Sequence, residues 1–308
     1  MSTVEFFLAG TFSAATIFLL AALGELVAEK SGVLNLSVEG MMAVSAAVGF
    51  AVTLETSNHV LGFAAAGVAG VLISLVFATT TITFLANQVA AGLAVGILGL
   101  GLSALIGRDY ESKTLPSTDG ISLPFLSELP LLGPVFFQQN LVVYLTFLMA
   151  FAIGFTLTHT RLGLAIRAVG ENPHAAQAQG IPVLLVRYSA VAFGGLLAGF
   201  AGAYASTIYT PLWADGMIAG RGWIAVALVV FGTWKTGRIA FGALLFGMVS
   251  LGELIAQTMG SRIPSQLLTS LPYIVTIIVL AIISTDRARM RLHSPFSLGQ
   301  TFDGSEGR

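Results

Sequence analysis

The stretch from Arg161 to Arg187, RLGLAIRAVGENPHAAQAQGIPVLLVR, is a polar break in an otherwise apolar chain. Long hydrophobic segments flank it on both sides. Its centre, HAAQAQG at residues 174–180, combines small residues with a closing glycine, which predicts a short helix that ends at Gly180. A short polar helix held between two membrane spans is suited to docking onto a cytoplasmic partner protein.

The composition indicates an integral membrane protein. The chain has 308 residues, of which 56% are hydrophobic and 9% charged, and its mean hydropathy is +0.89. Soluble domains carry about 25% charged residues. The low charge and the long apolar runs therefore predict an all-α, polytopic bundle of transmembrane helices. The sequence has no basic patch with interleaved aromatic residues, so no nucleic acid partner is expected.

Cysteine and histidine usage gives no support for a metal site or another cofactor. The chain has no cysteine, which excludes disulfides and thiolate metal sites. The histidines lack the spacing of metal ligands and are interpreted as structural or surface residues: His59, His159, His174 and His293. The N-terminus, MSTVEFFLAG, has no basic residue before the first apolar segment, so no signal peptide is expected.

Nine apolar segments approach the length of about 20 residues that a membrane-spanning helix requires. They lie near residues 6–27, 36–55, 60–84, 88–106, 140–160, 184–209, 217–234, 239–259 and 266–284. The 217–234 segment is the weakest, because it crosses only if Gly216–Arg221 belongs to it and is otherwise re-entrant. We therefore expect about nine spans.

The basic residues predict the orientation of these spans. They cluster after the fifth, seventh and last segments: Arg161, Arg167 and Arg187; Lys235 and Arg238; Arg287, Arg289 and Arg291. Because positively charged loops face the cytoplasm, the N-terminus is expected outside and the C-terminus inside. This gives one transmembrane domain over residues 1–292, with a cytoplasmic coupling segment at 161–187 and an outside loop at 107–139. The polar tail, residues 293–308, is expected to be disordered.

Glycines spaced four residues apart predict close contacts between helices. Gly92 and Gly96 form one such pair, and Gly195 and Gly199 form another, with Gly202 following. Lipid provides no hydrophobic force between helices, so close backbone approach has to supply the packing. The alternative is that these glycines are apolar residues of the spans without a role in helix packing.

Polar groups within the apolar segments are the candidate functional residues, because the sequence has no G-x-x-x-x-G-K-[ST], H-E-x-x-H or G-x-S-x-G motif. The first group lies in SGVLNLSVEGMM, residues 31–42, where Asn35 or Ser37 can cap the following helix. A helix that starts inside the protein would place Glu39 near a cavity. The alternative is an ordinary cytoplasmic hairpin with Glu39 in water.

The second group lies in YASTIYTPLWADGMIAGRGW, residues 204–223. Aromatic faces with a few hydrogen-bond donors suit a flat polar solute such as a sugar or nucleobase, which makes Arg221 and Trp223 candidates for the solute path. The alternative is an aromatic belt at the outer membrane interface, which would explain Tyr209 and Trp213 but not Asp215 or Arg221.

The third candidate is Glu253, inside the eighth apolar segment, with Ser250 and Gln257 on the same helical face. A carboxylate within a membrane is costly and by default suggests function. The alternative is a structural ion pair with Arg221 or Arg262.

Three runs of sequence resemble those of a known family: GELVAEKSGVLNLSVEGMM at 24–42, RAVGENPHAA at 167–176 and GMIAGRGWIA at 216–225. They are similar to the permease subunits of bacterial ABC importers in the branched-chain amino acid, ribose and nucleoside superfamily, in its simple-sugar or nucleoside branch. The likeness covers about residues 5–285. It implies a multi-pass subunit of the bacterial plasma (inner) membrane that transports a solute and is not an enzyme.

The resemblance also implies partners and a docking site. The partners are an ATP-binding subunit that hydrolyses ATP, a second and related permease subunit, an extracytoplasmic solute-binding protein and the lipid bilayer. The wider importer class docks its ATPase through an E-A-A-x-x-x-G loop, which Ala175, Ala176 and Gly180 match while His174 replaces the glutamate. The implied coupling residues are Glu171, Asn172, Pro173, His174, Ala175, Ala176 and Gly180. The motif NLSVEG favours a nucleoside or purine-like solute over ribose.

Two other functions compete with an importer subunit. An ion-coupled secondary transporter would need broken, pseudo-symmetric helices, whereas the polar coupling segment and the lack of evident internal repeats argue against it. A membrane scaffold without transport would leave Asn35, Glu39 and Glu253 unexplained.

Overall fold

The computed structural model describes residues 3–118, 120–121, 127, 132–258, 264–284 and 294–304, and these residues form a helical bundle without a β-sheet. The long helices are α1 (Thr3–Lys30), α2 (Val38–Thr56), α3 (His59–Ala78), α4 (Gln88–Gly107), α6 (Leu141–His159), α9 (Val183–Tyr204), α11 (Thr236–Thr258) and α12 (Ser265–Ser284). The shorter α-helices are α5 (Leu132–Phe136), α7 (Arg161–Glu171), α8 (Pro173–Ala178) and α10 (Arg221–Phe231). The π-helical turns η1 (Thr79–Thr83) and η3 (Ala205–Tyr209) extend α3 and α9, and the 3₁₀ turn η2 (Arg108–Tyr110) follows α4.

Every apolar segment expected from the sequence contains a helix, but the expected count of about nine spans is not confirmed. Among the described residues, 7 helices are long and apolar enough to cross a membrane. Helix α10 has 11 residues, which extend only about 16 Å at 1.5 Å per residue against a hydrocarbon core of about 30 Å. Helix α10 therefore does not cross by itself, in agreement with the re-entrant alternative. Helix α12 contains Pro272 and has a shorter apolar stretch at Gln266–Ile278.

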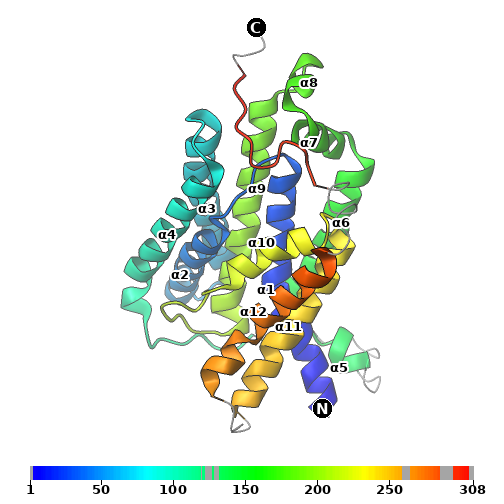
Figure 1. Cartoon of the computed structure of the whole chain (residues 1–308). Coiled ribbons are helices and arrows are strands. Elements are labelled where there is room, and N and C mark those ends of the chain that lie inside the picture. Colours follow the sequence, from blue (N-terminus) through cyan, green and yellow to red (C-terminus); the bar gives the residue numbers. More distant parts are fainter. Residues whose placement is uncertain are drawn as a thin grey trace.

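Helices α1, α2 and α9 form the centre of the bundle. Helix α9 packs against α3, α1 and α2, and α1 also packs along α10 and α11 (Figure 1). The glycine pattern is confirmed as one of close contacts within the chain. Gly195 and Gly199 approach the backbone of α3, while Gly92 and Gly96 approach the backbone around Leu36.

The two ends of the bundle differ in the segments that they carry. The N-terminal end of α1 and helix α5, from the expected outside loop, lie at one end (Figure 1). Helices α7 and α8 lie at the opposite end, together with residues 294–304 (Figure 1). The segments expected on opposite sides of the membrane are thus separated by the length of the bundle, while the direction of the bundle in the membrane stays a prediction.

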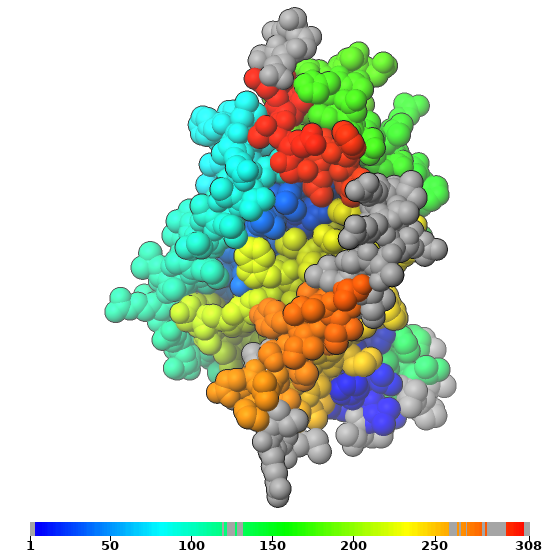
Figure 2. Space-filling model, in the orientation of Figure 1, coloured from blue at the N-terminus to red at the C-terminus, as the bar shows by residue number. Residues whose placement is uncertain are grey.

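The expectation of a disordered C-terminal tail is wrong for residues 294–304. The Ser297 amide donates to the carbonyl of Gly170 at 3.0 Å, and the Arg187 guanidinium donates to the Ser297 hydroxyl at 3.3 Å. Phe302 is 4% exposed and packs with Val169, Ala176 and Val183. Figure 2 shows this segment, in red, lying against the green surface of α7 and α8. A phenylalanine and a serine within a polar tail give little periodic signal, so this packing was not evident from composition.

Candidate functional site

Helix α10 begins inside the bundle, where a carboxylate from another helix caps it. The Gly220 amide donates to Glu39 Oε1 at 2.9 Å, and the Trp223 amide donates to Glu39 Oε2 at 3.3 Å. Glu39 belongs to the first turn of α2 and is only 8% exposed. The first amides of a helix have no partner within it, and a negative charge is favourable at this end. Glu39 therefore fixes the start of α10 within the protein.

Glycine is required on both sides of this cap. Gly220 has a φ of 82°, and a Cβ there would collide with the Tyr273 hydroxyl. A Cβ at Gly222 would lie 2.6 Å from the Glu39 backbone nitrogen, so a side chain would push α10 away from α2. The backbone between η3 and α10 can reach this position because glycine adopts positive φ without strain.

A cavity of about 260 Å³ lies beside the start of α10. Its polar lining includes Tyr209, Arg221, Glu253 and Tyr273, contributed by η3, α10, α11 and α12. The guanidinium of Arg221 stacks 5.8 Å from the centre of the Tyr209 ring, while its Nη1 is buried and has no hydrogen-bond partner among the described residues. A buried donor without a partner is costly unless a ligand or water satisfies it. The cavity can therefore offer cationic donors, a carboxylate acceptor and two tyrosines to a polar solute.

Glu253 shares this cavity with Arg221 and accepts a hydrogen bond from Gln257 Nε2 at 3.1 Å. No salt bridge joins the described side chains of Glu253 and Arg221, so this version of the structural ion pair is not observed. Arg262, the other expected partner of Glu253, lies outside the described residues.

Asn35 and Ser37, which the sequence offered as candidates for the solute path, are outside the described lining of this cavity and are fully buried in the connection between α1 and α2. The backbone amide of Asn35 donates to Glu25 Oε1 at 2.9 Å, and the side-chain Oδ1 of Asn35 accepts from the backbone amide of Ser37 at 3.0 Å. These bonds turn the chain so that α2 starts against α1. The alternative in which Glu39 lies in water is wrong, since Glu39 is buried against α10.

The aromatic residues of the 204–223 stretch divide between several environments. Trp213 is 2% exposed and packs with Ala47 and Phe50, so a belt at the membrane interface does not explain it. Tyr209 lines the cavity. Trp223 is 42% exposed, and its amide rather than its ring makes the contact with Glu39.

Three residues of interest were missed by the sequence interpretation. Tyr273 follows a proline inside an apolar helix, which is a weak signal. Glu25 and Glu29 are buried in α1, where Glu25 accepts from the Asn35 amide and Glu29 accepts from Trp234 Nε1 at 2.5 Å. The argument that identified Glu253 also applies to Glu25 and Glu29: a carboxylate within a membrane span is costly and therefore suggests a function.

The coupling segment forms two short helices joined at Asn172. The Asn172 side chain accepts from the Ala175 amide at 3.0 Å and Pro173 occupies the first turn of α8, as expected for a helix start. Gly180 has a φ of 80° and closes the helix, which confirms the expected glycine stop. The exposed members of the expected coupling set are Glu171, Asn172, His174, Ala175 and Gly180.

Pro173 and Ala176 face the protein interior instead. Ala176 is 4% exposed and contacts the cluster that contains Phe302, so it does not belong to the exposed face of α8. The exposed face of α8 is carried by neighbouring residues such as His174 and Ala175.

Comparison with known proteins gives consistent matches over nearly the whole chain. The family model described as the permease component of the branched-chain amino acid transport system matches residues 7–283. The putative glucose ABC transporter permease protein TsgC13 of Haloferax volcanii is 38% identical, with 98% of this chain and 99% of that protein covered. The guanosine ABC transporter permease protein NupQ of Bacillus subtilis is 36% identical, with 85% and 86% covered. The nucleoside ABC transporter permease protein NupC of Lactococcus lactis is 30% identical, with 92% and 93% covered.

No solved structure matches the chain. The helical bundle with its apolar spans, the capped helices of the coupling segment and the matches along the chain agree with one another. This protein is a multi-pass plasma membrane transport component, not an enzyme, and it belongs to the family of branched-chain amino acid transport system permease components, among its sugar and nucleoside ABC transporter permeases.

Proposed function

We propose that this chain forms the translocation path of an ATP-driven importer and that the cavity beside α10 is a transient solute site on that path. The observation that carries the proposal is the buried Nη1 of Arg221, which has no hydrogen-bond partner among the described residues and lies in a cavity that also contains Glu253 and two tyrosines. In a membrane protein, an unsatisfied polar group of this kind marks a place where a polar solute gains hydrogen bonds that lipid cannot supply.

The proposed solute is a nucleoside or a simple sugar. Both carry neighbouring hydroxyl groups that can donate to the Glu253 carboxylate and accept from the Arg221 guanidinium. The tyrosine rings provide an apolar face for a nucleobase or for the C–H face of a sugar. The names of the similar permeases, which refer to glucose, guanosine and nucleosides, support the same two solute classes.

The proposed assembly follows from the two ends of the bundle. An ATP-binding subunit would dock on the exposed side of α7 and α8, and a solute-binding protein would dock at the opposite end. A second, related permease subunit would complete the path. In this proposal residues 1–292 form a single transmembrane domain, with the packed segment 294–304 attached to its cytoplasmic face.

Substituting Glu253→Gln or Arg221→Ala is expected to reduce the maximal rate of ATP-dependent solute uptake by about tenfold or more. Each substitution removes a charge-assisted hydrogen bond to the solute worth roughly 1.5–3 kcal/mol, and about 1.4 kcal/mol corresponds to a tenfold change. The measurement is uptake of labelled guanosine and glucose by cells that contain the intact transporter at matched permease levels.

The matched control is Thr258→Ala, which removes a hydroxyl from α11 outside the cavity and should leave uptake unchanged. Binding of solute to the solute-binding protein should be the same for all variants. Unchanged uptake in both cavity variants would show that the cavity lies off the path. Uptake that survives ATP depletion but stops with an uncoupler would indicate an ion-coupled transporter rather than an ATP-driven importer.

The proposed orientation places the N-terminus and the 107–139 loop outside and the C-terminus in the cytoplasm. Because the chain lacks cysteine, single cysteines report position directly. Ser117→Cys and Ser127→Cys should react with a membrane-impermeant thiol reagent added to intact cells. Gln179→Cys, at the exposed end of α8, should react only after the membrane is opened. The reverse pattern would invert the proposed orientation.

A further inference from the structure

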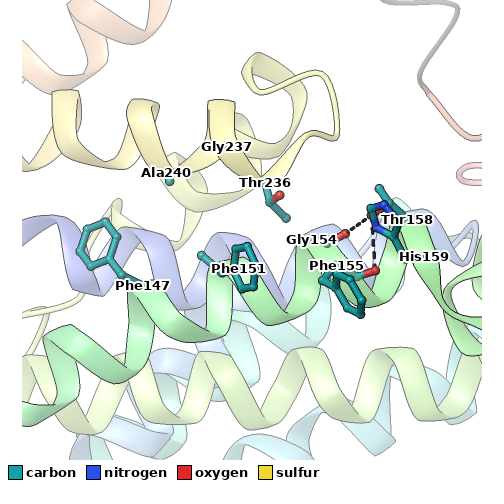
Figure 3. A pocket seen from close by; sticks show the side chains of 10 residues that line it. Phe147, Phe151, Gly154, Phe155, Thr158, His159, Thr236, Gly237 and Ala240 are labelled. Atoms are coloured by element: carbon teal, nitrogen blue, oxygen red, sulfur yellow. Dashed lines mark hydrogen bonds between the residues drawn. The ribbon is translucent and has the colours of Figure 1, made fainter.

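An apolar groove runs along the outer surface of the bundle between α6 and the first turns of α11. It has a volume of about 470 Å³ and is lined mainly by apolar residues, among them Phe147, Phe151 and Phe155. Figure 3 shows these phenylalanines following one another along α6 beneath α11, with Thr158 and His159 at the far end. Phe151 is 72% exposed and Phe155 is 52% exposed, so the groove is open to the surroundings of the chain. In a membrane those surroundings include acyl chains.

At its polar end the groove joins a second pocket of about 290 Å³, with which it shares Gly154, Thr158, Thr236 and Gly237. The described lining of this pocket includes the cations Lys30, Arg167 and Lys235 and no acidic residue. Lys30 comes from the end of α1, Arg167 from α7, and Lys235 from the turn before α11. Three segments that are far apart in the sequence thus bring positive charge to one pocket.

The electrostatics of this pocket favour an anion. Lys30 is close enough to Arg167 and Lys235 for mutual repulsion, and Glu29 and Glu171 offset part of the positive charge near Lys30. Glu29 is fully buried and is engaged by Trp234, while Glu171 is exposed at the end of α7. A bound anion would relieve the repulsion between the cations and would accept hydrogen bonds from them and from the Thr236 hydroxyl.

We propose that the groove and the pocket together form a binding site for one anionic glycerophospholipid of the cytoplasmic leaflet. Its phosphate would lie among Lys30, Arg167 and Lys235, and an acyl chain would lie along Phe147, Phe151 and Phe155. Basic pockets between helices on the cytoplasmic side have the chemistry that anionic head groups require. The inner-leaflet assignment rests on the proposed orientation, in which α7 lies at the cytoplasmic surface.

The lipid would join the bundle to the coupling segment. Arg167 lies on α7, one turn before Glu171 and the start of α8, whereas Lys30 belongs to α1 at the centre of the bundle. A phosphate held by both would connect these helices through charge-assisted hydrogen bonds. The protein would then retain anionic lipid independently of solute and ATP.

The test is native mass spectrometry of the full-length chain purified in detergent and titrated with phosphatidylglycerol or phosphatidylcholine. We expect preferential retention of one phosphatidylglycerol. Arg167→Gln and Lys235→Gln should each weaken that retention roughly fivefold, as expected for loss of one cation near an anionic lipid. Gly237→Leu should also weaken it, because a Cβ at Gly237 meets no described atom within 4 Å, so the added side chain can extend into the junction of groove and pocket.

Two matched controls separate the site from general effects of charge and size. Arg161→Gln removes an exposed cation at the start of α7, outside the described lining of the pocket. Gly101→Leu adds the same side chain at another open glycine, on α4. Both controls should retain phosphatidylglycerol as the unmodified chain does.

Several results would overturn the proposal. They are equal retention of both lipids, equal retention by all variants, or complete displacement of the lipid by inorganic phosphate. Disulfide cross-linking of two copies through Phe151→Cys would show that a second copy covers the groove instead. Lipid retention is measured without transport. Uptake by the cavity variants Glu253→Gln and Arg221→Ala therefore tests the proposed solute path separately. Labelling of Gln179→Cys from outside would refute the placement of the lipid in the inner leaflet, but not the lipid site itself.

Discussion

Replacing Glu39 with alanine is expected to lower solute uptake by tenfold or more, because the amides of Gly220 and Trp223 would lose their acceptor inside the bundle. A buried donor left without a partner costs about 1–3 kcal/mol, and two such donors at a helix start would displace α10. Arg221 is the first residue of α10, so its guanidinium would leave the cavity with the helix. The measurement is uptake at matched permease levels in the membrane.

Glu39→Gln separates the capping role from other roles of the carboxylate. Its amide oxygen can still accept one hydrogen bond, whereas its NH₂ group would face the other backbone donor, so uptake should be intermediate. Glu55→Ala is the matched control, because Glu55 is an exposed carboxylate at the other end of the same helix. If Glu39→Ala transports at the unaltered rate, the cap does not position α10 for function.

The second large effect is expected at α8, where two adjacent alanines face in opposite directions. Ala175 is exposed, so Ala175→Arg should leave the fold intact and obstruct docking of the ATP-binding subunit. Overpacking an interface costs about 1–3 kcal/mol, which corresponds to roughly fivefold to 150-fold weaker association. Uptake and co-purification of the ATP-binding subunit should therefore both fall, while the thermal unfolding temperature stays the same.

Ala176→Arg should act differently, because Ala176 packs against the cluster containing Phe302 and Val169. An arginine there would be buried without a partner, which costs about 3–5 kcal/mol, so the main result should be a lower unfolding temperature. Ala90→Arg, at an exposed alanine in the first turn of α4, controls for added charge. Normal association and uptake with Ala175→Arg would show that the exposed face of α8 is not the docking site.

Much of the fold followed from local chemistry in the sequence. The long apolar runs become helices because a helix satisfies its own backbone hydrogen bonds, which lipid requires. Asn172, Pro173 and Gly180 bound α8 because side-chain capping, a fixed φ and a left-handed backbone conformation are properties of single residues. The glycine pairs in α4 and α9 indicated close packing, because the lack of a side chain lets the backbone of any neighbouring segment approach closely.

The candidate site could be predicted only in part. Arg221 and Glu253 were identified because charge inside an apolar segment is costly wherever it lies. Their role could not be separated from that of Asn35 and Ser37, because sequence spacing does not tell which side chains turn toward a cavity. Tyr273 joins the site from α12, more than fifty residues along the chain from Arg221, through packing alone.

The sequence by itself determined the class of protein, its helical segments, the caps of the coupling segment and the family, since each depends on composition or on neighbouring residues. Only the tertiary structure decided that Glu39 caps α10, that Ala176 faces inward against Phe302, and that Lys30, Arg167 and Lys235 meet at one pocket. These features depend on contacts between residues distant in the sequence. Such contacts are set by how whole helices pack, and no local pattern encodes them.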